Sequence, residues 1–186
     1  MKRNKASLGV RTMAGFLGLA ACAFAQLPPA GQDKFQSILE VRLECTTGPL
    51  VGRTFEGGLT GPTTVARKTP LNLGGGVHTI ETEIVSMSLT GFAGEVGRPG
   101  SGADLAVRES PTRASTGQVR TLPGPGDFPA ESFFDVFVEI DLAMGGQPIQ
   151  LMNPTAARVQ ATINGIPPIE ADYVGNQPVP LYTGGQ

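Results

Sequence analysis

The sequence predicts an all-β fold, an antiparallel β-sandwich with an irregular β-barrel as the alternative, preceded by a signal-peptide helix. Glycine (26 residues) and proline (16 residues) are spread along the 186-residue chain rather than confined to a linker. They separate short runs of alternating apolar and polar residues at intervals of about ten residues, which is the pattern of sandwiches and barrels. No run has a convincing helical period.

The first 25 residues have the layout of a secretory signal peptide. Four basic residues and no acid come first, and residues 13–24 are apolar or small throughout, as export signals require. This segment is shorter than the roughly 20 apolar residues that span a bilayer. We therefore expect an exported product, secreted or periplasmic, with no transmembrane helix.

Two cleavage patterns overlap in the stretch LAACAFAQ at residues 19–26. Cleavage after the AFA tripeptide at 23–25 would release a soluble chain that begins at Gln26. The LAAC motif at 19–22 is similar to the lipobox of bacterial lipoproteins, in which Cys22 would carry acyl chains and hold the protein on a membrane. A membrane-anchored lipoprotein with lipidated Cys22 is therefore the alternative localisation.

The charge balance argues against nucleic acid as a partner. Residues 1–25 contain four of the 14 basic residues and none of the 16 acidic residues, so the processed chain has ten basic and 16 acidic groups and a net charge of −6. Nucleic-acid affinity comes mainly from Lys and Arg on phosphates. We expect one domain at 35–182, after a linker at 26–34 and before a tail at 183–186.

Ten runs are expected to form strands. They are Ser37–Thr46, Arg53–Leu59, Thr63–Lys68, Val77–Leu89, Leu105–Glu109, Gly117–Leu122, Ser132–Leu142, Pro148–Met152, Ala157–Ile163 and Ile169–Val174. The clearest is SFFDVFVEIDL at 132–142, in which alternate residues from Phe134 to Leu142 form an apolar core face. We expect this run to be the central strand of its sheet.

Two features predict irregularities in the strands. In VHTIETEIVSMSL the apolar register changes near Ile84, which indicates a β-bulge or a crossing between sheets. Asn164-Gly165 between two apolar runs predicts a type I′ hairpin. Pro167 and Pro168 would place its return strand at an edge.

Cys45 is the only cysteine left after cleavage before Gln26, so no internal disulfide is expected. In the strand SILEVRLEC, Cys45 shares a face with Leu39, Val41 and Leu43. We expect a buried thiol that packs as a small hydrophobic group. A reactive or intermolecular thiol is the alternative.

No catalytic, metal or cofactor-binding residue is predicted, because no group of residues carries a catalytic signature. His78 is the only histidine, and it would lie on the opposite strand face from Glu81 and Glu83. No G-x-S-x-G stretch is present.

Carboxylates offer the alternative function, a carboxylate-dependent glycan hydrolase. Asp135, Glu139 and Asp141 share a strand face on which alternate residues lie about 6.6–6.8 Å apart, and glycosidases place two carboxylates roughly 5–9.5 Å apart. The lack of Trp, with only two Tyr, argues against sugar cleavage. Calcium held by Glu139, Asp141 and loop carbonyls is a further hypothesis.

Three arginines form the candidate ligand surface. Arg108, Arg113 and Arg120 alternate with hydroxyl residues in VRESPTRASTGQVR, and a guanidinium group suits a carboxylate or phosphate ligand. The segments Gly91–Asp104 and Leu122–Glu131 are expected to be loops beside them. The alternative is that the arginines pair with the acidic strand.

The strand ESFFDVFVEIDL, with SPTRASTGQVR before it and TIETEIVSMSLTG further upstream, is similar to uncharacterised secreted bacterial proteins grouped as a domain of unknown function. The similarity covers most of residues 35–182. It implies an exported β-domain and no particular activity. We expect a binding or structural protein of the envelope or extracellular space, whose partner is an unknown ligand or an envelope protein.

Overall fold

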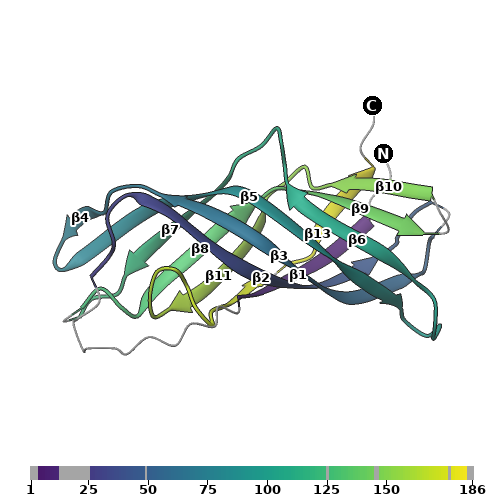
Figure 1. Cartoon of the computed structure of the whole chain (residues 1–186), viewed down its shortest axis with the longest axis horizontal. Helices are drawn as coiled ribbons and strands as arrows, with labels where there is room; N and C mark the ends of the chain where they lie inside the picture. Colours follow the sequence, from purple (N-terminus) through teal and green to yellow (C-terminus); the bar gives the residue numbers. More distant parts are fainter. Residues whose placement is uncertain are drawn as a thin grey trace.

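The computed structural model describes residues 4–12, 26–48, 50–124, 126–144, 147–175 and 177–183. These residues form thirteen strands, all paired antiparallel, and no helix (Figure 1). The strands are β1 (Asn4–Thr12), β2 (Gly31–Glu44), β3 (Thr54–Arg67), β4 (Leu71–Gly74), β5 (Val77–Glu95), β6 (Gly102–Glu109), β7 (Ser115–Thr121), β8 (Ala130–Val136), β9 (Val138–Met144), β10 (Gln147–Met152), β11 (Ala157–Ile163), β12 (Asp172–Gly175) and β13 (Val179–Thr183). The all-β antiparallel prediction is confirmed. Within these residues no helix is long and apolar enough to cross a membrane.

The three longest strands lie next to one another in the sheet. β2 and β3 have 14 residues each and β5 has 19, and they pair side by side in the order β2, β3, β5. Glycines on β3 and β5 allow these strands to approach closely. A Cβ atom at Gly57 would lie 2.2 Å from the carbonyl oxygen of Phe92, and one at Gly91 would lie 2.2 Å from that of Gly58.

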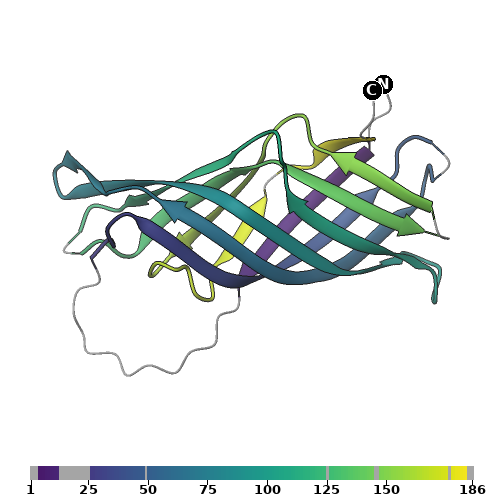
Figure 2. The same cartoon turned by 45° about the horizontal axis from the view of Figure 1, so that its top comes forward.

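The sheet divides at β5 into two branches (Figure 2). Thr79–Ile84 of β5 pair with β7, whereas Ser88–Gly94 pair with β6. We call β7, β8, β11 and β12 the β7 branch, and β6, β9, β10 and β13 the β6 branch, following their pairing order. Between the two regions the partner of β3 changes from Ser86 to Ile84, which leaves Val85 as a bulge. The predicted irregularity near Ile84 is confirmed, and it lies where the sheet divides.

The predicted central strand at 132–142 passes from one branch to the other. Its apolar face is buried from Phe134 to Leu142, as predicted. The run is nevertheless two strands, β8 and β9, because the ladder is interrupted at Phe137. There, the Phe137 N–H donates to Ser115 Oγ at 2.8 Å, and the Val138 N–H donates to Asn153 Oδ1 at 2.7 Å. Two buried side chains therefore replace backbone partners at the crossing.

Two local predictions are wrong. Asn164-Gly165 is not a type I′ hairpin, which needs positive φ at both central residues; neither residue has it. The chain instead continues as a loop to β12, since Pro167 and Pro168 have no N–H to extend the ladder. The segment 91–104 is not one loop either: β5 continues to Glu95 and β6 begins at Gly102.

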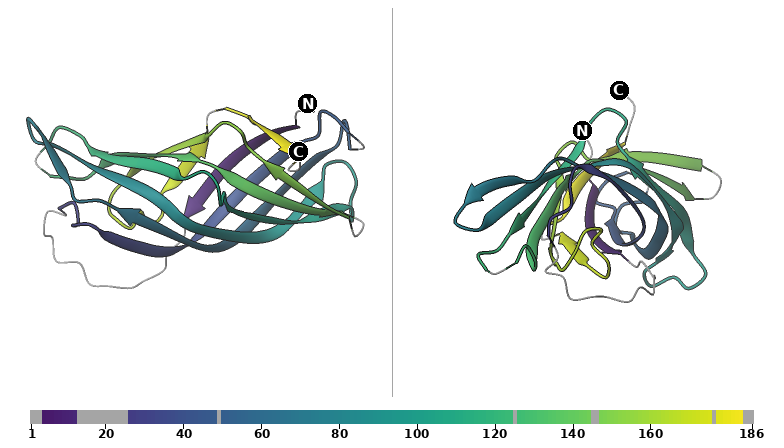
Figure 3. Two further views of the ribbon diagram at one scale, coloured as in Figure 1. Left: turned by 90° about the horizontal axis from the view of Figure 1, so that it is seen from above. Right: turned by 60° about the vertical axis from the view of Figure 1, so that its left-hand side comes forward.

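The N-terminal segment differs from the predicted signal-peptide helix. Asn4–Thr12 form strand β1, which lies between β2 on one side and β12 and β13 on the other (Figure 3). The rest of the predicted leader, residues 13–25 with the lipidation candidate Cys22, lies outside the described residues. β2 begins at Gly31, inside the predicted linker at 26–34.

The core is continuous through both branches. It contains Phe55, Leu59 and Ile80, which are completely buried, and the apolar faces of most other strands. Cys45 is partly buried against this core as a free thiol. Burial raises the pKa of the thiol. Cys45 packs against the core as predicted, but it is partly rather than fully buried.

Candidate functional site

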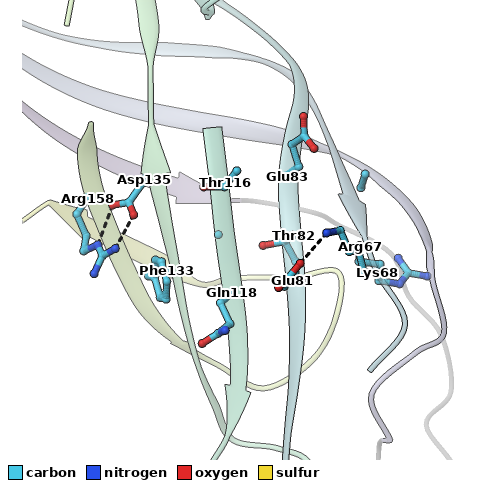
Figure 4. Close-up of a pocket in the computed structure, with 12 residues that line it drawn as sticks. Arg67, Lys68, Glu81, Thr82, Glu83, Thr116, Gln118, Phe133, Asp135 and Arg158 are labelled. Carbon is cyan, nitrogen blue, oxygen red and sulfur yellow. Dashed lines mark hydrogen bonds and ion pairs between the residues drawn. The ribbon is translucent and has the colours of Figure 1, made fainter. Parts of the chain in front are cut away.

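An open groove of 490 Å³ lies on the outer face of the β7 branch and its neighbours β5 and β3 (Figure 4). Side chains from five strands line it because outward-facing residues alternate with core residues along each strand. The groove is lined by Lys68, which follows β3, by Glu81 and Glu83 of β5, Thr116 and Gln118 of β7, Phe133 and Asp135 of β8, and Arg158 of β11, together with smaller contributions from their neighbours.

One wall of the groove is a stacked ion pair. Arg158 Nε donates to Asp135 Oδ1 at 2.8 Å, and a second guanidinium nitrogen donates to Asp135 Oδ2. The guanidinium carbon lies 4.2 Å from the centre of the Phe133 ring. Hydrogen bonding to Asp135 raises the pKa of Arg158. The wall is therefore a fixed, charge-balanced surface with an aromatic side chain at its base.

The opposite wall is a second ion pair. Lys68 Nζ donates to Glu81 Oε2 at 2.7 Å, and this hydrogen bond raises the pKa of the lysine. The backbone holds the same two residues together, since the Lys68 N–H donates to the Glu81 carbonyl oxygen at 2.9 Å. Both walls thus have little net charge.

The floor between the walls carries free hydrogen-bonding groups. Glu83, Thr116 and Gln118 have no side-chain hydrogen bond or ion pair with any residue that the structure describes. The register places Glu83 opposite Thr116, and Thr116 opposite Asp135. A carboxylate, a hydroxyl and an amide are therefore presented to solvent from adjacent positions.

Gly117, in the floor of the groove, allows close packing of β7 against β8 and β5. A Cβ atom there would lie 2.3 Å from the Phe133 carbonyl oxygen and 2.8 Å from Thr82 Oγ1. Thr82 Oγ1 is itself buried without a hydrogen-bond partner in the described part of the chain. No larger residue fits at Gly117 without moving β7 away from β8.

The three predicted arginines are not brought together. Arg108 Nε donates to Glu139 Oε2 at 3.0 Å, and another guanidinium nitrogen donates to Asp141. Arg113 donates to the Pro154 carbonyl oxygen, and its guanidinium carbon lies 5.3 Å from the Phe137 ring centre.

Arg120 lies on β7 opposite Glu131 of β8, and no side-chain partner is found for it among the described residues. Phe137, which Arg113 covers, lies six residues further along the chain, about 20 Å by strand rise. Arg120 and the Arg113–Phe137 contact are therefore at separate positions on one outer face. They do not form a single pocket for an acidic ligand.

The carboxylates of the acidic strand face are all occupied. Asp135 is held by Arg158, and Glu139 and Asp141 are held by Arg108. Their oxygens accept charge-assisted hydrogen bonds from guanidinium groups and are not free for a substrate. Of the three predicted arginines, Arg108 pairs with this strand as the alternative has it, whereas no such pairing is found for Arg113 or Arg120 among the described residues.

His78 has a partner that sequence patterns did not indicate. Its Nδ1 lies 2.8 Å from Asp127 Oδ1, while Asp127 Oδ2 accepts the Leu27 N–H at 2.8 Å. Glu81 and Glu83 are not part of this arrangement. In the described ranges no three His, Cys, Asp or Glu side chains gather as a metal site would need, and the calcium hypothesis stays a prediction.

Glu109 is a partly buried carboxyl group where β6 ends. Its Oε1 accepts the Ser115 N–H at 3.0 Å, whereas its Oε2 is buried and has no hydrogen-bond partner in the described chain. Burial raises the pKa of Glu109 to about 7, and the negative charge of Glu83 adds to this effect.

Sequence reasoning missed the groove because its residues come from five separate strands. Asp135 belongs to the carboxylate face that the sequence predicts, but Lys68, Gln118 and Arg158 carry no motif. The only sequence signal is the outward position of polar residues in TGQVR and ARVQ. The strand order, which brings these runs beside β8, cannot be derived from that alternation.

Comparison with known proteins gives one informative likeness. No protein-family model matches the chain, and no curated protein matches it. Among solved structures, the chain is similar to DynF from the dynemicin biosynthesis pathway of Micromonospora chersina, with a TM-score of 0.56 and 15% sequence identity. The similarity covers 94% of this chain and 95% of DynF. It concerns the fold, which the two chains share over nearly their whole length.

Proposed function

We propose that this chain is an exported β-sandwich domain that binds an uncharged polyhydroxylated ligand, a saccharide, in the groove of the β7 branch. The observation that supports this proposal is the combination of two charge-balanced walls with a floor of free polar groups. The leader-like residues 1–25 support export.

The chemistry of the groove favours hydroxyl groups over charged ones. Glu83 can accept hydrogen bonds, Thr116 can donate and accept, and the Gln118 amide can do both. A phosphate or carboxylate ligand would meet Glu83 without a free cation to balance it, because Lys68 and Arg158 already bind Glu81 and Asp135. The volume of 490 Å³ lies within the range of small-molecule sites, about 300–1,000 Å³.

The test is binding of neutral oligosaccharides to the purified protein by calorimetry, with Gln118→Ala as the variant. Gln118→Ala should weaken binding about tenfold, which is the loss expected for one or two hydrogen bonds. Gln36→Ala is the matched control, since Gln36 is an exposed glutamine of β2 outside the groove. Equal weakening by both variants, or binding only of acidic oligosaccharides, would contradict the proposal.

Glycan hydrolysis is the second candidate, and the groove supports it at a different pair of residues from the one in the sequence prediction. Glu83 and Asp135 lie two strands apart on one face, so their Cα atoms are separated by about 9.6 Å. For hydrolysis, Asp135 would have to leave its ion pair with Arg158 when the substrate binds. Product release that is abolished by Glu83→Gln while binding persists would establish hydrolysis; binding without product supports the binding function alone.

Export is tested separately by the intact mass of the protein isolated from its producing cells. A chain that begins at Gln26 supports a soluble exported protein. A chain that begins at acylated Cys22 supports the lipoprotein alternative. A chain that retains residues 1–25 contradicts export.

A further inference from the structure

A second open hollow, of 540 Å³, adjoins the groove at Arg158. Its lining comes from β11 with the residues just before it, and from the segment that leads from β12 into β13. The lining residues used below are Arg158, Gln160, Gln177 and Pro178. Arg158 also lines the groove, and in Figure 4 it stands at the opposite edge of the view from Lys68. The two hollows therefore share one side chain.

The second hollow exists because β12 covers β11 over a short length. β12 pairs with β11 at Val159 and Gln160. It ends at Gly175, and β13 begins at Val179. β12 therefore does not reach Arg158, and the space beside Arg158 on the side away from β8 stays open.

Two rows of outward side chains cross the strands from the groove to the second hollow. One row consists of Glu83, Thr116, Asp135 and Arg158, and the other of Glu81, Gln118, Phe133 and Gln160. Neighbouring members of a row are opposite each other in the ladders of β5, β7, β8 and β11. Three strand spacings separate the two ends of a row, which is about 14 Å. This path is longer than a single sugar ring.

We propose that the ligand of the groove is an oligosaccharide that lies across these four strands and continues into the second hollow, where Gln160 and Gln177 bind its far end. The inference rests on the proposed function, because it extends the same site. It adds the length of the ligand, its direction across the sheet and a second set of binding residues.

The chemistry of the second hollow matches that of the groove. Among its described lining residues Arg158 is the only charged one, and Asp135 balances that charge. Gln160 and Gln177 are exposed and have no side-chain hydrogen bond with any described residue. Both amides can therefore donate to and accept from hydroxyl groups. Pro178 supplies an apolar surface for the C–H groups of a sugar ring.

Arg158 connects the two hollows and leaves the path between them open. Its guanidinium carbon lies 4.2 Å from the Phe133 ring centre, and Asp135 accepts two of its N–H groups. These contacts hold the guanidinium group against β8. A guanidinium group has five N–H donors, so further donors remain for hydroxyl groups of a ligand that passes over Arg158.

Calorimetry with matched neutral disaccharides and hexasaccharides of glucose, mannose and galactose tests the extended site. We expect one hexasaccharide to bind per chain, at least about tenfold more tightly than its disaccharide, because only the longer ligand makes the hydrogen bonds of both hollows. Gln160→Ala should weaken hexasaccharide binding about tenfold, the loss expected for one or two hydrogen bonds, and leave disaccharide binding unchanged. Gln118→Ala should weaken the binding of both.

Two further variants make the comparison specific. Gln177→Ala removes an amide from the other side of the second hollow and should repeat the effect of Gln160→Ala. Gln36→Ala is the matched control, since Gln36 is an exposed glutamine of β2 outside both hollows. It should change the binding of neither ligand.

The outcomes separate the extended site from the proposed function. Hexasaccharide binding that is unchanged by Gln160→Ala and Gln177→Ala would confine the ligand to the groove and overturn only the extension. Two hexasaccharides per chain, or disaccharide binding weakened by Gln160→Ala, would indicate independent sites and also overturn it. Failure of every saccharide to bind, or binding that Gln118→Ala does not weaken, would contradict the proposed function itself.

Discussion

The guanidinium group of Arg108 bridges Glu139 to Asp141, two carboxylates on the same outer face of β9. One nitrogen lies 2.9 Å from Glu139 Oε2, and a different nitrogen donates to Asp141 Oδ2. A single cation therefore keeps two like charges on neighbouring outward positions of one strand.

Replacing Arg108 should lower the free energy of unfolding. Arg108→Ala leaves Glu139 and Asp141 without their cation, and we expect a loss of about 1 kcal/mol, since the side chain is partly exposed. The measurement is urea unfolding at neutral pH. Arg120→Ala is the matched control because Arg120 has no side-chain partner among the described residues. Equal stability of the two variants would refute a structural role for Arg108.

Asn153 should be essential at the crossing from β8 to β9. Its side chain accepts from the Val138 N–H at 2.7 Å and donates to the Val136 carbonyl oxygen at 2.8 Å. Asn153→Ala leaves both backbone groups buried and unpaired, which costs about 1–3 kcal/mol each. The measurement is thermal unfolding by circular dichroism, with the exposed loop variant Asn164→Ala as the control. A change in melting temperature no larger than that of the control would contradict this role.

Glu109 should make stability decrease as the pH rises. Its pKa in the folded protein is raised to about 7 from 4.5, so the folded state holds a proton that the unfolded state has lost between these values. The stability that the protonated Glu109 contributes is complete below about pH 4.5 and is lost as the pH rises through 7. Glu109→Gln should therefore be more stable than the original protein at pH 8 and equal to it at pH 4.5. Chemical unfolding at the two pH values measures this difference, and Glu131→Gln, at an exposed position, should show neither effect.

Glu95 should make stability decrease as the pH falls, the opposite of the effect of Glu109. Arg53 Nε donates to Glu95 Oε1 at 2.7 Å, and this interaction lowers the pKa of Glu95 to about 2. Stability from the pair is complete above pH 4.5 and decreases as the pH falls towards 2. Glu95→Gln should therefore be less stable than the original protein at pH 7, and the difference should shrink between pH 4.5 and 2. A difference that is constant over this range would contradict the assignment.

Strand content and the inner faces followed from the sequence because both depend on local alternation. The buried face from Phe134 to Leu142 and the bulge near Ile84 are examples, since a change of apolar register is visible in the residues themselves. The break at Phe137 was not predictable, because it depends on Ser115 and Asn153, which are distant in sequence and chemically ordinary.

Turn signals were less reliable than strand signals. Asn164-Gly165 predicts a tight hairpin in isolation, but the prolines that follow prevent pairing beside it. The glycines of 91–104 suggested a loop, whereas Gly91 lies inside β5, where lack of a side chain permits close approach of β3. The groove required knowledge of which strands are neighbours, and that information lies in long-range pairing.

The continuity of β2, β3 and β5 through both branches has a thermodynamic consequence. Each of these strands contributes residues to the core at both ends of the molecule, so neither branch can lose its structure while the other keeps a complete sheet. Unfolding should therefore be a single cooperative transition. A ligand bound on the β7 branch would then slow amide hydrogen exchange in β9 and β10, far from the residues it touches.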